Sequence, residues 1–180
     1  MEKFAFIIHP LSIHDMAHVS PVLKFIPDSW LESALKLKKP FQVSHITGIK
    51  SPYAEAEGWF IGCPLTSKQM VELPEEFVMD RIIESGKIAQ ELGAKVVGLG
   101  AFTSIVGDAG ITVAKNLDIA VTSGNSYTVA TALEGTREAV RLMGKDLATA
   151  HVTIVGASGS IGAACTRTVS YTHLTLPTKL

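Results

Sequence analysis

The sequence is poor in cysteine and shows no excess of either charge. Cys63 and Cys165 are its two cysteines in 180 residues. Their wide separation is typical of small buried residues in a reducing compartment rather than of a disulfide framework. The 16 basic and 17 acidic residues give a net charge of −1, which provides no electrostatic footprint for nucleic acid or an anionic membrane. These scarcities predict a cytoplasmic protein that binds no nucleic acid.

Long apolar runs are also missing. No run approaches the length that crosses a bilayer, and Phe4 to Ile8 is too short for a secretion signal and ends at His9 and Pro10. The apolar content of 47% is nevertheless enough for a sizeable core. We therefore expect a soluble chain without a membrane span.

The order of periodic segments predicts the fold class. Strands are expected at 3–8, 41–49, 58–63, 95–100, 118–122 and 152–155, with the second and third forming a hairpin. Helices are expected at 12–19, 28–37, 74–92, 108–116 and 126–143. From about Pro74 onward helices and strands alternate, which is typical of an α/β fold with a mainly parallel sheet.

The stretch 151–162 has the pattern of a strand, a glycine turn and the start of a helix. Val152 to Val155 is a β-branched run suited to a strand buried in a parallel sheet. Three glycines follow as G-x-x-G-x-x-G, a variant of the commoner dinucleotide-binding motif. Main-chain amides of such a turn bind phosphate oxygens, whereas the alternative is an ordinary tight turn without a ligand. The predicted cofactor-binding residues are Gly156, Ala157, Ser158, Gly159, Ser160, Ile161 and Gly162.

Two loops carry glycines and small hydroxyl residues just beyond predicted strands. Open α/β sheets bind ligands at the carboxyl ends of their strands, so these loops are candidates for contact with substrate. Asn125 or Ser126 could also serve simply as the N-cap of the next helix, and one residue can do both. The predicted substrate-binding residues are Thr103, Ser104, Ser123, Gly124, Asn125, Ser126 and Thr128.

Two other patterns favour structural roles. His14 and His18 share one face of a short predicted helix, but a metal site would need a third ligand such as His9 or His45. Cys63 has no base beside it in the sequence and is expected to be a small core residue. We predict no metal site.

Three segments in this order resemble one family: Val-Gly-Leu-Gly-Ala-Phe-Thr-Ser-Ile-Val (97–106), Val-Thr-Ser-Gly-Asn-Ser-Tyr-Thr (121–128) and Val-Gly-Ala-Ser-Gly-Ser-Ile-Gly (155–162). The family is the long-chain acyl-[acyl-carrier-protein] reductases of cyanobacteria and their bacterial relatives, often described as predicted amino acid dehydrogenases or as shikimate-dehydrogenase-like. The resemblance covers most of residues 1–168 and is strongest from Gly98 onward.

The resemblance implies reduction of a fatty acyl thioester to an aldehyde through a cysteine thioester and hydride transfer. It implies NADP or NAD as cofactor and a small-molecule or acyl-carrier-bound substrate as partner. Gly156, Gly159 and Gly162 match the cofactor loop of the family. The family's catalytic cysteine lies beyond the end of this chain, so neither Cys63 nor Cys165 takes that role.

The expected organisation is an N-terminal α/β substrate-side domain over residues 1–148, then the first β-turn-α of a truncated Rossmann domain over 149–168. The threonine-rich residues 169–180, with Pro177, do not read as a continuing helix. They resemble a translated adapter, so we expect them to be non-native. On this interpretation the chain is a fragment of an NAD(P)-dependent oxidoreductase, inactive because half of the cofactor cleft is absent.

Two alternatives remain open at this point. One is a dehydrogenase acting on a small carboxylate, as shikimate and amino acid dehydrogenases do. A small acid would require a cationic anchor, and Lys115 is the nearest cation to the candidate loops, which slightly favours an apolar substrate. The other alternative is a non-catalytic nucleotide-binding module.

Overall fold

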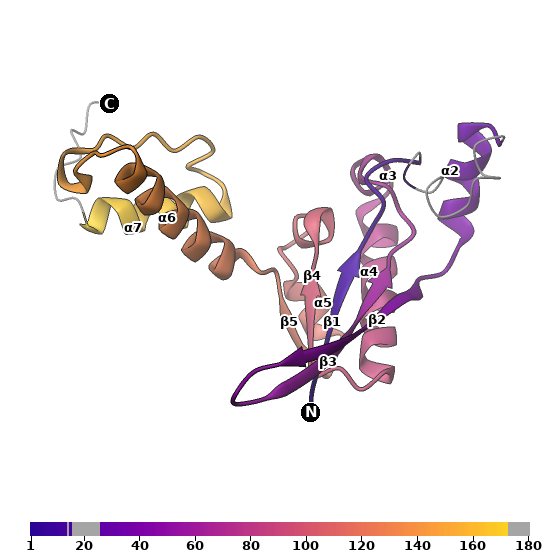
Figure 1. The fold of residues 1–180 in the computed structure, drawn as a ribbon. Helices are drawn as coiled ribbons and strands as arrows, with labels where there is room; N and C mark the ends of the chain where they lie inside the picture. Colours follow the sequence, from indigo (N-terminus) through magenta and orange to yellow (C-terminus); the bar gives the residue numbers. More distant parts are fainter. Residues whose placement is uncertain (14, 16–25, 173–180) are drawn as a thin grey trace. The chain divides into compact units, whose positions relative to one another are not determined.

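The computed structural model describes residues 1–13, 15 and 26–172, which form two compact units, Met1–Ser123 and Gly124–Leu180 (Figure 1). The strands are β1 (Glu2–Ile8), β2 (Phe41–Lys50), β3 (Glu55–Gly62), β4 (Val96–Leu99) and β5 (Ala120–Thr122). The helices of the first unit are α2 (Asp28–Leu37), α3 (Ser67–Glu72), α4 (Glu75–Glu91), the 3-10 turn η2 (Ala101–Ser104) and α5 (Ile111–Lys115). Those of the second unit are α6 (Asn125–Leu142), the 3-10 turn η3 (Leu147–Thr149) and α7 (Ser160–Thr172).

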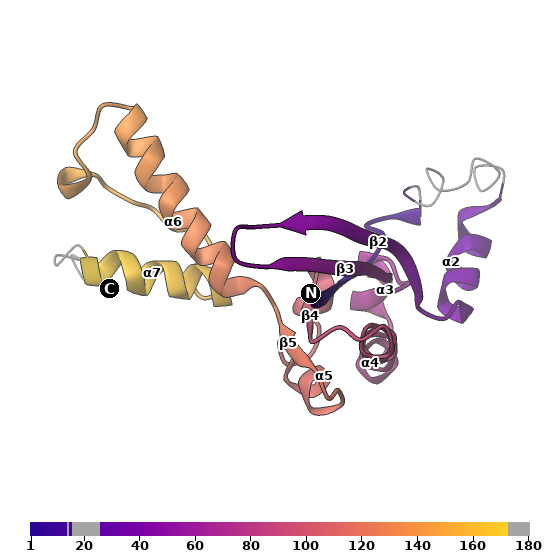
Figure 2. The same cartoon turned by 60° about the horizontal axis from the view of Figure 1, so that its bottom comes forward.

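The first unit is built on one five-stranded sheet with the order β2-β3-β1-β4-β5. β1, β3, β4 and β5 run parallel, and only β2 runs antiparallel, as the hairpin partner of β3. Figures 1 and 2 show α4 and α5 on the same face of this sheet. The predicted α/β class and the predicted hairpin are therefore confirmed.

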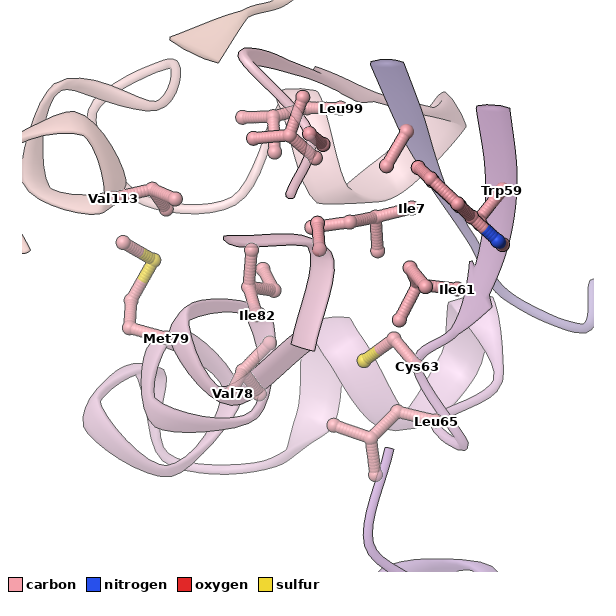
Figure 3. Close-up of a cluster of buried hydrophobic side chains, with 14 of the residues drawn as sticks. Ile7, Trp59, Ile61, Cys63, Leu65, Val78, Met79, Ile82, Leu99 and Val113 are labelled. Atoms are coloured by element: carbon pink, nitrogen blue, oxygen red, sulfur yellow. The ribbon is translucent and has the colours of Figure 1, made fainter. Parts of the chain in front are cut away.

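The core lies between this face and α4 (Figure 3). Alternate residues of the parallel strands point to it, so that Ile7 and Ile61 pair in register and are both fully buried. Val78 and Ile82, four residues apart on α4, are also fully buried, as expected for one face of an amphipathic helix. Burying side chains of this size contributes about 1.5–3 kcal/mol each, and this packing fixes α4 on the sheet.

A polar cluster holds the β2–β3 hairpin against β1. The Glu57 carboxylate lies 3.4 Å from Lys3 Nζ and 3.0 Å from His45 Nε2. The His45 ring stacks on the Trp59 ring with centroids 5.2 Å apart, and Lys3 Nζ lies 5.5 Å from the Trp59 ring centroid. The Glu57 side chain is only 15% exposed, so its partners are screened less than those of a surface carboxylate.

The second unit lacks the strand that the sequence predicts at Val152 to Val155. The segment is irregular, and the Val155 side chain is 95% exposed. A strand needs a neighbour that satisfies its backbone N–H and C=O groups. Among the described residues of Gly124–Leu180 no other strand exists to supply one. The prediction of a buried strand is wrong, whereas the glycine turn and the helix after it are formed.

Other boundaries differ in smaller ways from the predictions. α7 continues to Thr172 and so includes residues 169–172, which the sequence suggested lay outside the helix. The units divide between Ser123 and Gly124, and the domain limits at 148 and 168 stay predictions. The helix predicted at 12–19 falls largely outside the described residues.

Helix length and polarity also bear on membrane insertion. Over the residues that the structure describes, no helix combines the length and apolar character needed to cross a bilayer.

We expect Glu57→Gln to lower the free energy of unfolding by about 1 kcal/mol, because two partners lose a charged acceptor in a partly buried setting. Urea unfolding at neutral pH measures this. Glu55→Gln is the matched control, because Glu55 pairs with Lys50 at 2.8 Å but both side chains are more than half exposed. Equal losses in the two variants would show that the cluster adds nothing beyond a surface pair.

Candidate functional site

The carboxyl ends of the four parallel strands bring chemically capable residues to one edge of the sheet. His9 follows β1, Cys63 follows β3, η2 follows β4, and Ser123 follows β5. This edge is where open α/β sheets bind ligands. The structure therefore places part of the predicted substrate set where such a site is expected.

The hydroxyls of Thr103 and Ser104 are already used within η2. Thr103 Oγ1 donates to the Gly100 carbonyl at 2.7 Å, and Ser104 Oγ donates to the Ala101 carbonyl at 2.7 Å. Thr103 is 1% exposed. These bonds stabilise the turn. Binding of substrate by the two residues stays a prediction, and it would require Thr103 to become accessible.

His9 joins the end of β1 to η2, a connection that sequence reasoning missed. The Phe102 backbone N–H donates to His9 Nε2 at 3.1 Å, so this nitrogen carries no proton. Nδ1 lies 3.0 Å from the Pro10 carbonyl and therefore holds the proton of the neutral ring. Burial lowers the pKa of His9, outweighing the bond to Pro10. No spacing in the sequence points to this role.

The turn that follows β4 is tightly constrained. A Cβ at Gly100 would lie 2.6 Å from the Ile7 carbonyl oxygen, so a side chain there would displace the central strand. Ala101 has φ +47°, in the left-handed region that costs a non-glycine residue about 1–2 kcal/mol. The close approach of β1 and this turn fixes where Phe102 meets His9.

Cys63 is a buried thiol of the core, as predicted. Its side chain is fully buried. Burial raises the pKa of the Cys63 thiol to about 11, although hydrogen bonds with Leu65 and Ser85 act in the opposite direction. Because the thiolate is the nucleophile, this cysteine stays unreactive at neutral pH. Cys165 is buried as well.

The second predicted loop opens α6. Gly124 has φ +73° and is the residue before the helix, so neither Asn125 nor Ser126 is its N-cap. Asn125 Nδ2 donates to Ser160 Oγ at 3.0 Å, which joins the predicted substrate loop to the predicted cofactor loop within one unit. Ser126 is exposed, and Thr128 Oγ1 donates to the Gly124 carbonyl at 3.2 Å.

The glycine turn has a geometry that only glycine permits at two positions. Gly156 has φ +76°, and a Cβ at Gly162 would lie 2.1 Å from the Gly156 carbonyl oxygen. The Gly159 N–H donates to that same carbonyl at 3.0 Å and is thereby engaged. Residues 156–160 are all exposed. The turn is compact and open to solvent.

Two helix N-termini meet at this turn. α6 begins at Asn125 and α7 at Ser160, the two residues joined by the hydrogen bond above, and both views show the helix starts side by side (Figures 1 and 2). Each N-terminus is equivalent to roughly half a positive charge. Neither helix carries an acidic residue in its first turn. The two positive ends thus lie together without a carboxylate from either first turn between them.

Metal binding finds no support among the described residues. In this part of the chain no three residues of histidine, cysteine, aspartate or glutamate are grouped to hold an ion. His9 is engaged by Phe102, and His45 by Glu57. His14 and His18 lie outside the described residues.

Gly100→Ala and Ala101→Gly should change stability in opposite directions. The first forces a Cβ against the Ile7 carbonyl and should lower the free energy of unfolding by about 1–3 kcal/mol. The second relieves left-handed strain, partly offset by the freedom of glycine in the unfolded chain, and should raise it by up to about 1 kcal/mol. Urea unfolding checks both, and a loss in both variants would contradict the strained turn.

His9 should make stability depend on pH. The pKa of His9 is lowered in the folded protein. The stability that the neutral His9 ring contributes is therefore fully present above the unfolded pKa of about 6.5, and it is lost as pH falls through the folded pKa. In His9→Asn a non-titrating carbonyl can accept from Phe102. Urea unfolding across this range should show a smaller loss for His9→Asn than for wild type, and parallel losses would disprove the assignment.

The chain matches no family model. It is similar to "Aminotransferase PigE" of Serratia sp. (strain ATCC 39006), with 29% identity over 177 residues. The similarity covers 92% of this chain but 20% of that relative, so the chain spans about one fifth of the length of the protein it resembles.

This similarity corrects the function expected from the sequence. The sequence predicted an NAD(P)-dependent oxidoreductase, either an acyl reductase or a dehydrogenase of small carboxylates. The relative is instead named as an aminotransferase. The expectations of a dehydrogenase and of a non-catalytic nucleotide-binding module are overturned with it. The resemblance to acyl-[acyl-carrier-protein] reductases is likewise unsupported by a family match.

Proposed function

We propose that this chain is a ligand-binding segment of a larger enzyme of the aminotransferase kind, and that the turn Gly156 to Gly162 binds a phosphate or diphosphate group. The observation that carries the proposal is the meeting of the α6 and α7 N-termini at Asn125 and Ser160. Helix N-termini bind anions through unpaired N–H groups and a favourable dipole.

The charge balance of the turn supports an anion. Two adjacent positive helix ends repel each other, and an anion between them would stabilise both. The Gly159 N–H is committed to Gly156, so the donors for an anion are the remaining amides at the start of α7 and the hydroxyl of Ser160. The exposure of residues 156–160 gives a ligand access to them.

The ligand class follows from these donors. Main-chain amides and one hydroxyl suit phosphate oxygens, and they do not distinguish one phosphate ester from another. The cofactor predicted from the sequence, NADP or NAD, carries a diphosphate and is therefore a suitable ligand with which to test phosphate binding. The proposal contains no redox step.

Pyridoxal phosphate is the cofactor that aminotransferase chemistry implies, and the described residues of the second unit do not fit it. Pyridoxal enzymes hold their cofactor as a Schiff base on a lysine. The lysine among residues 124–172 is Lys145, which follows the C-terminal end of α6. A helix of 18 residues is about 27 Å long, so Lys145 lies far from the end that meets the turn. We therefore derive no amino-transfer step on this unit.

The remaining predictions belong to the same proposal. The substrate is a small or carrier-bound molecule held near the carboxyl edge of the sheet, and the protein acts in the cytoplasm.

Gly162→Ala should weaken binding of pyrophosphate and NADP by at least about tenfold, because its Cβ would collide with the Gly156 carbonyl and open the turn. Titration calorimetry on the full chain measures this. Gly135→Ala is the matched control, since Gly135 lies within α6 and has no atom within 4 Å of an added Cβ.

Circular dichroism should show both variants to be folded, with Gly135→Ala slightly more helical. The proposal fails if the wild-type chain binds neither pyrophosphate nor NADP, or if the two variants bind them equally well.

A further inference from the structure

The first unit contains a cavity that none of the predicted site residues lines. Its volume is about 270 Å³, and it lies at the carboxyl ends of β1 and β3, beside the start of β2. Its walls are mainly apolar, and its lining includes Ile8, Pro10, Phe41 and Val43 together with the charged residues Asp15 and Lys38.

The volume sets the size of the molecule that fits. An apolar protein cavity of about 150 Å³ holds one benzene molecule. A cavity of about 270 Å³ therefore holds one ring with a short side chain, or an alkyl group of similar bulk. Phe41 and Val43 are 36% and 48% exposed, so this wall is open enough for a ligand to cover it.

The two charged residues are not equally available. The Asp15 carboxylate already accepts the Ser12 backbone N–H at 2.8 Å. Lys38 Nζ instead lies 3.9 Å from the Phe41 ring centroid, where it meets the face of the ring. Among the described residues no carboxylate lies within ion-pair distance of Lys38. An ammonium over a ring face keeps N–H donors for an anion.

His9 and Cys63 also line the cavity, but their polar atoms are not available to a ligand. Both ring nitrogens of His9 are engaged, by Phe102 and Pro10. The Cys63 side chain points into the core, and its thiol stays protonated. Lys38 is thus the lining side chain with N–H donors available to an anionic ligand, whereas Asp15 is held by the Ser12 N–H.

We propose that this cavity binds a small monoanionic molecule whose apolar aryl or short alkyl body fills the space against Phe41 and Val43 and whose carboxylate pairs with Lys38. Most pockets for small molecules have this composition, with apolar walls and few polar groups that fix orientation. The inference concerns the first unit alone and does not depend on phosphate binding at the glycine turn.

Titration of the full chain with phenylacetate, followed by NMR chemical shifts, tests the proposal. We expect phenylacetate to bind, and phenylacetamide and phenethylamine to bind at least about tenfold more weakly, because neither offers an anion to Lys38. Lys38→Met keeps an apolar stem on Phe41 and should weaken phenylacetate about tenfold while leaving phenylacetamide unchanged.

Lys39→Met is the matched control, because Lys39 is the exposed neighbour that does not line the cavity. Val43→Trp lies on the edge strand β2, which tolerates an aromatic residue, and should block all three ligands by filling the cavity. Thermal unfolding confirms that each variant is folded. The proposal is overturned if wild type fails to bind phenylacetate at millimolar concentration, or if Lys38→Met and Lys39→Met bind it alike.

Discussion

The last carbonyls of β1 fix the geometry of the first unit. The Ile8 carbonyl accepts the Cys63 N–H at 2.8 Å, and the Ile7 carbonyl accepts the Gly100 N–H at 3.0 Å. Buried carbonyls need such partners. The chain therefore leaves β3 and β4, the neighbours of β1, beside the end of β1. The contact is so close on the β4 side that position 100 must be glycine. His9 is the next residue along, and its neutral ring locks η2 in place.

Local signals in the sequence were sufficient to predict most of this unit. The Pro74 start and the Gly93 end of α4, and the alternation along β2, depend on residues within a few positions, which is why their predicted bounds agree with the structure. Val152 to Val155 shows where local signals fail. Its β-branched run has the propensity for a strand, but a strand forms only beside another strand, and propensity does not report whether one exists.

The residues of the candidate sites could be located from local sequence signals, but their partners in the fold could not. Hydroxyl residues beyond strand ends could be located from the sequence, but whether Thr103 is satisfied by its own turn could not. The Asn125–Ser160 bond joins residues 35 positions apart, and nothing in either loop predicts that partner. The Phe41 and Val43 wall was missed because these residues read as ordinary members of an alternating strand, and the cavity arises from their packing near Gly62.

The similarity to an aminotransferase shows what a glycine turn does and does not indicate. Main-chain amides and helix dipoles bind phosphate whatever reaction the phosphate-bearing molecule undergoes. Such a turn therefore indicates binding of a phosphate group. It does not distinguish hydride transfer from amino transfer, because both depend on side chains elsewhere. In the second unit Asn125 and Ser160 position the turn, and the lysine among its described residues, Lys145, follows the far end of α6 and does not reach the turn to form a Schiff base. A phosphate site at this turn would therefore leave the reaction to be sought in other residues.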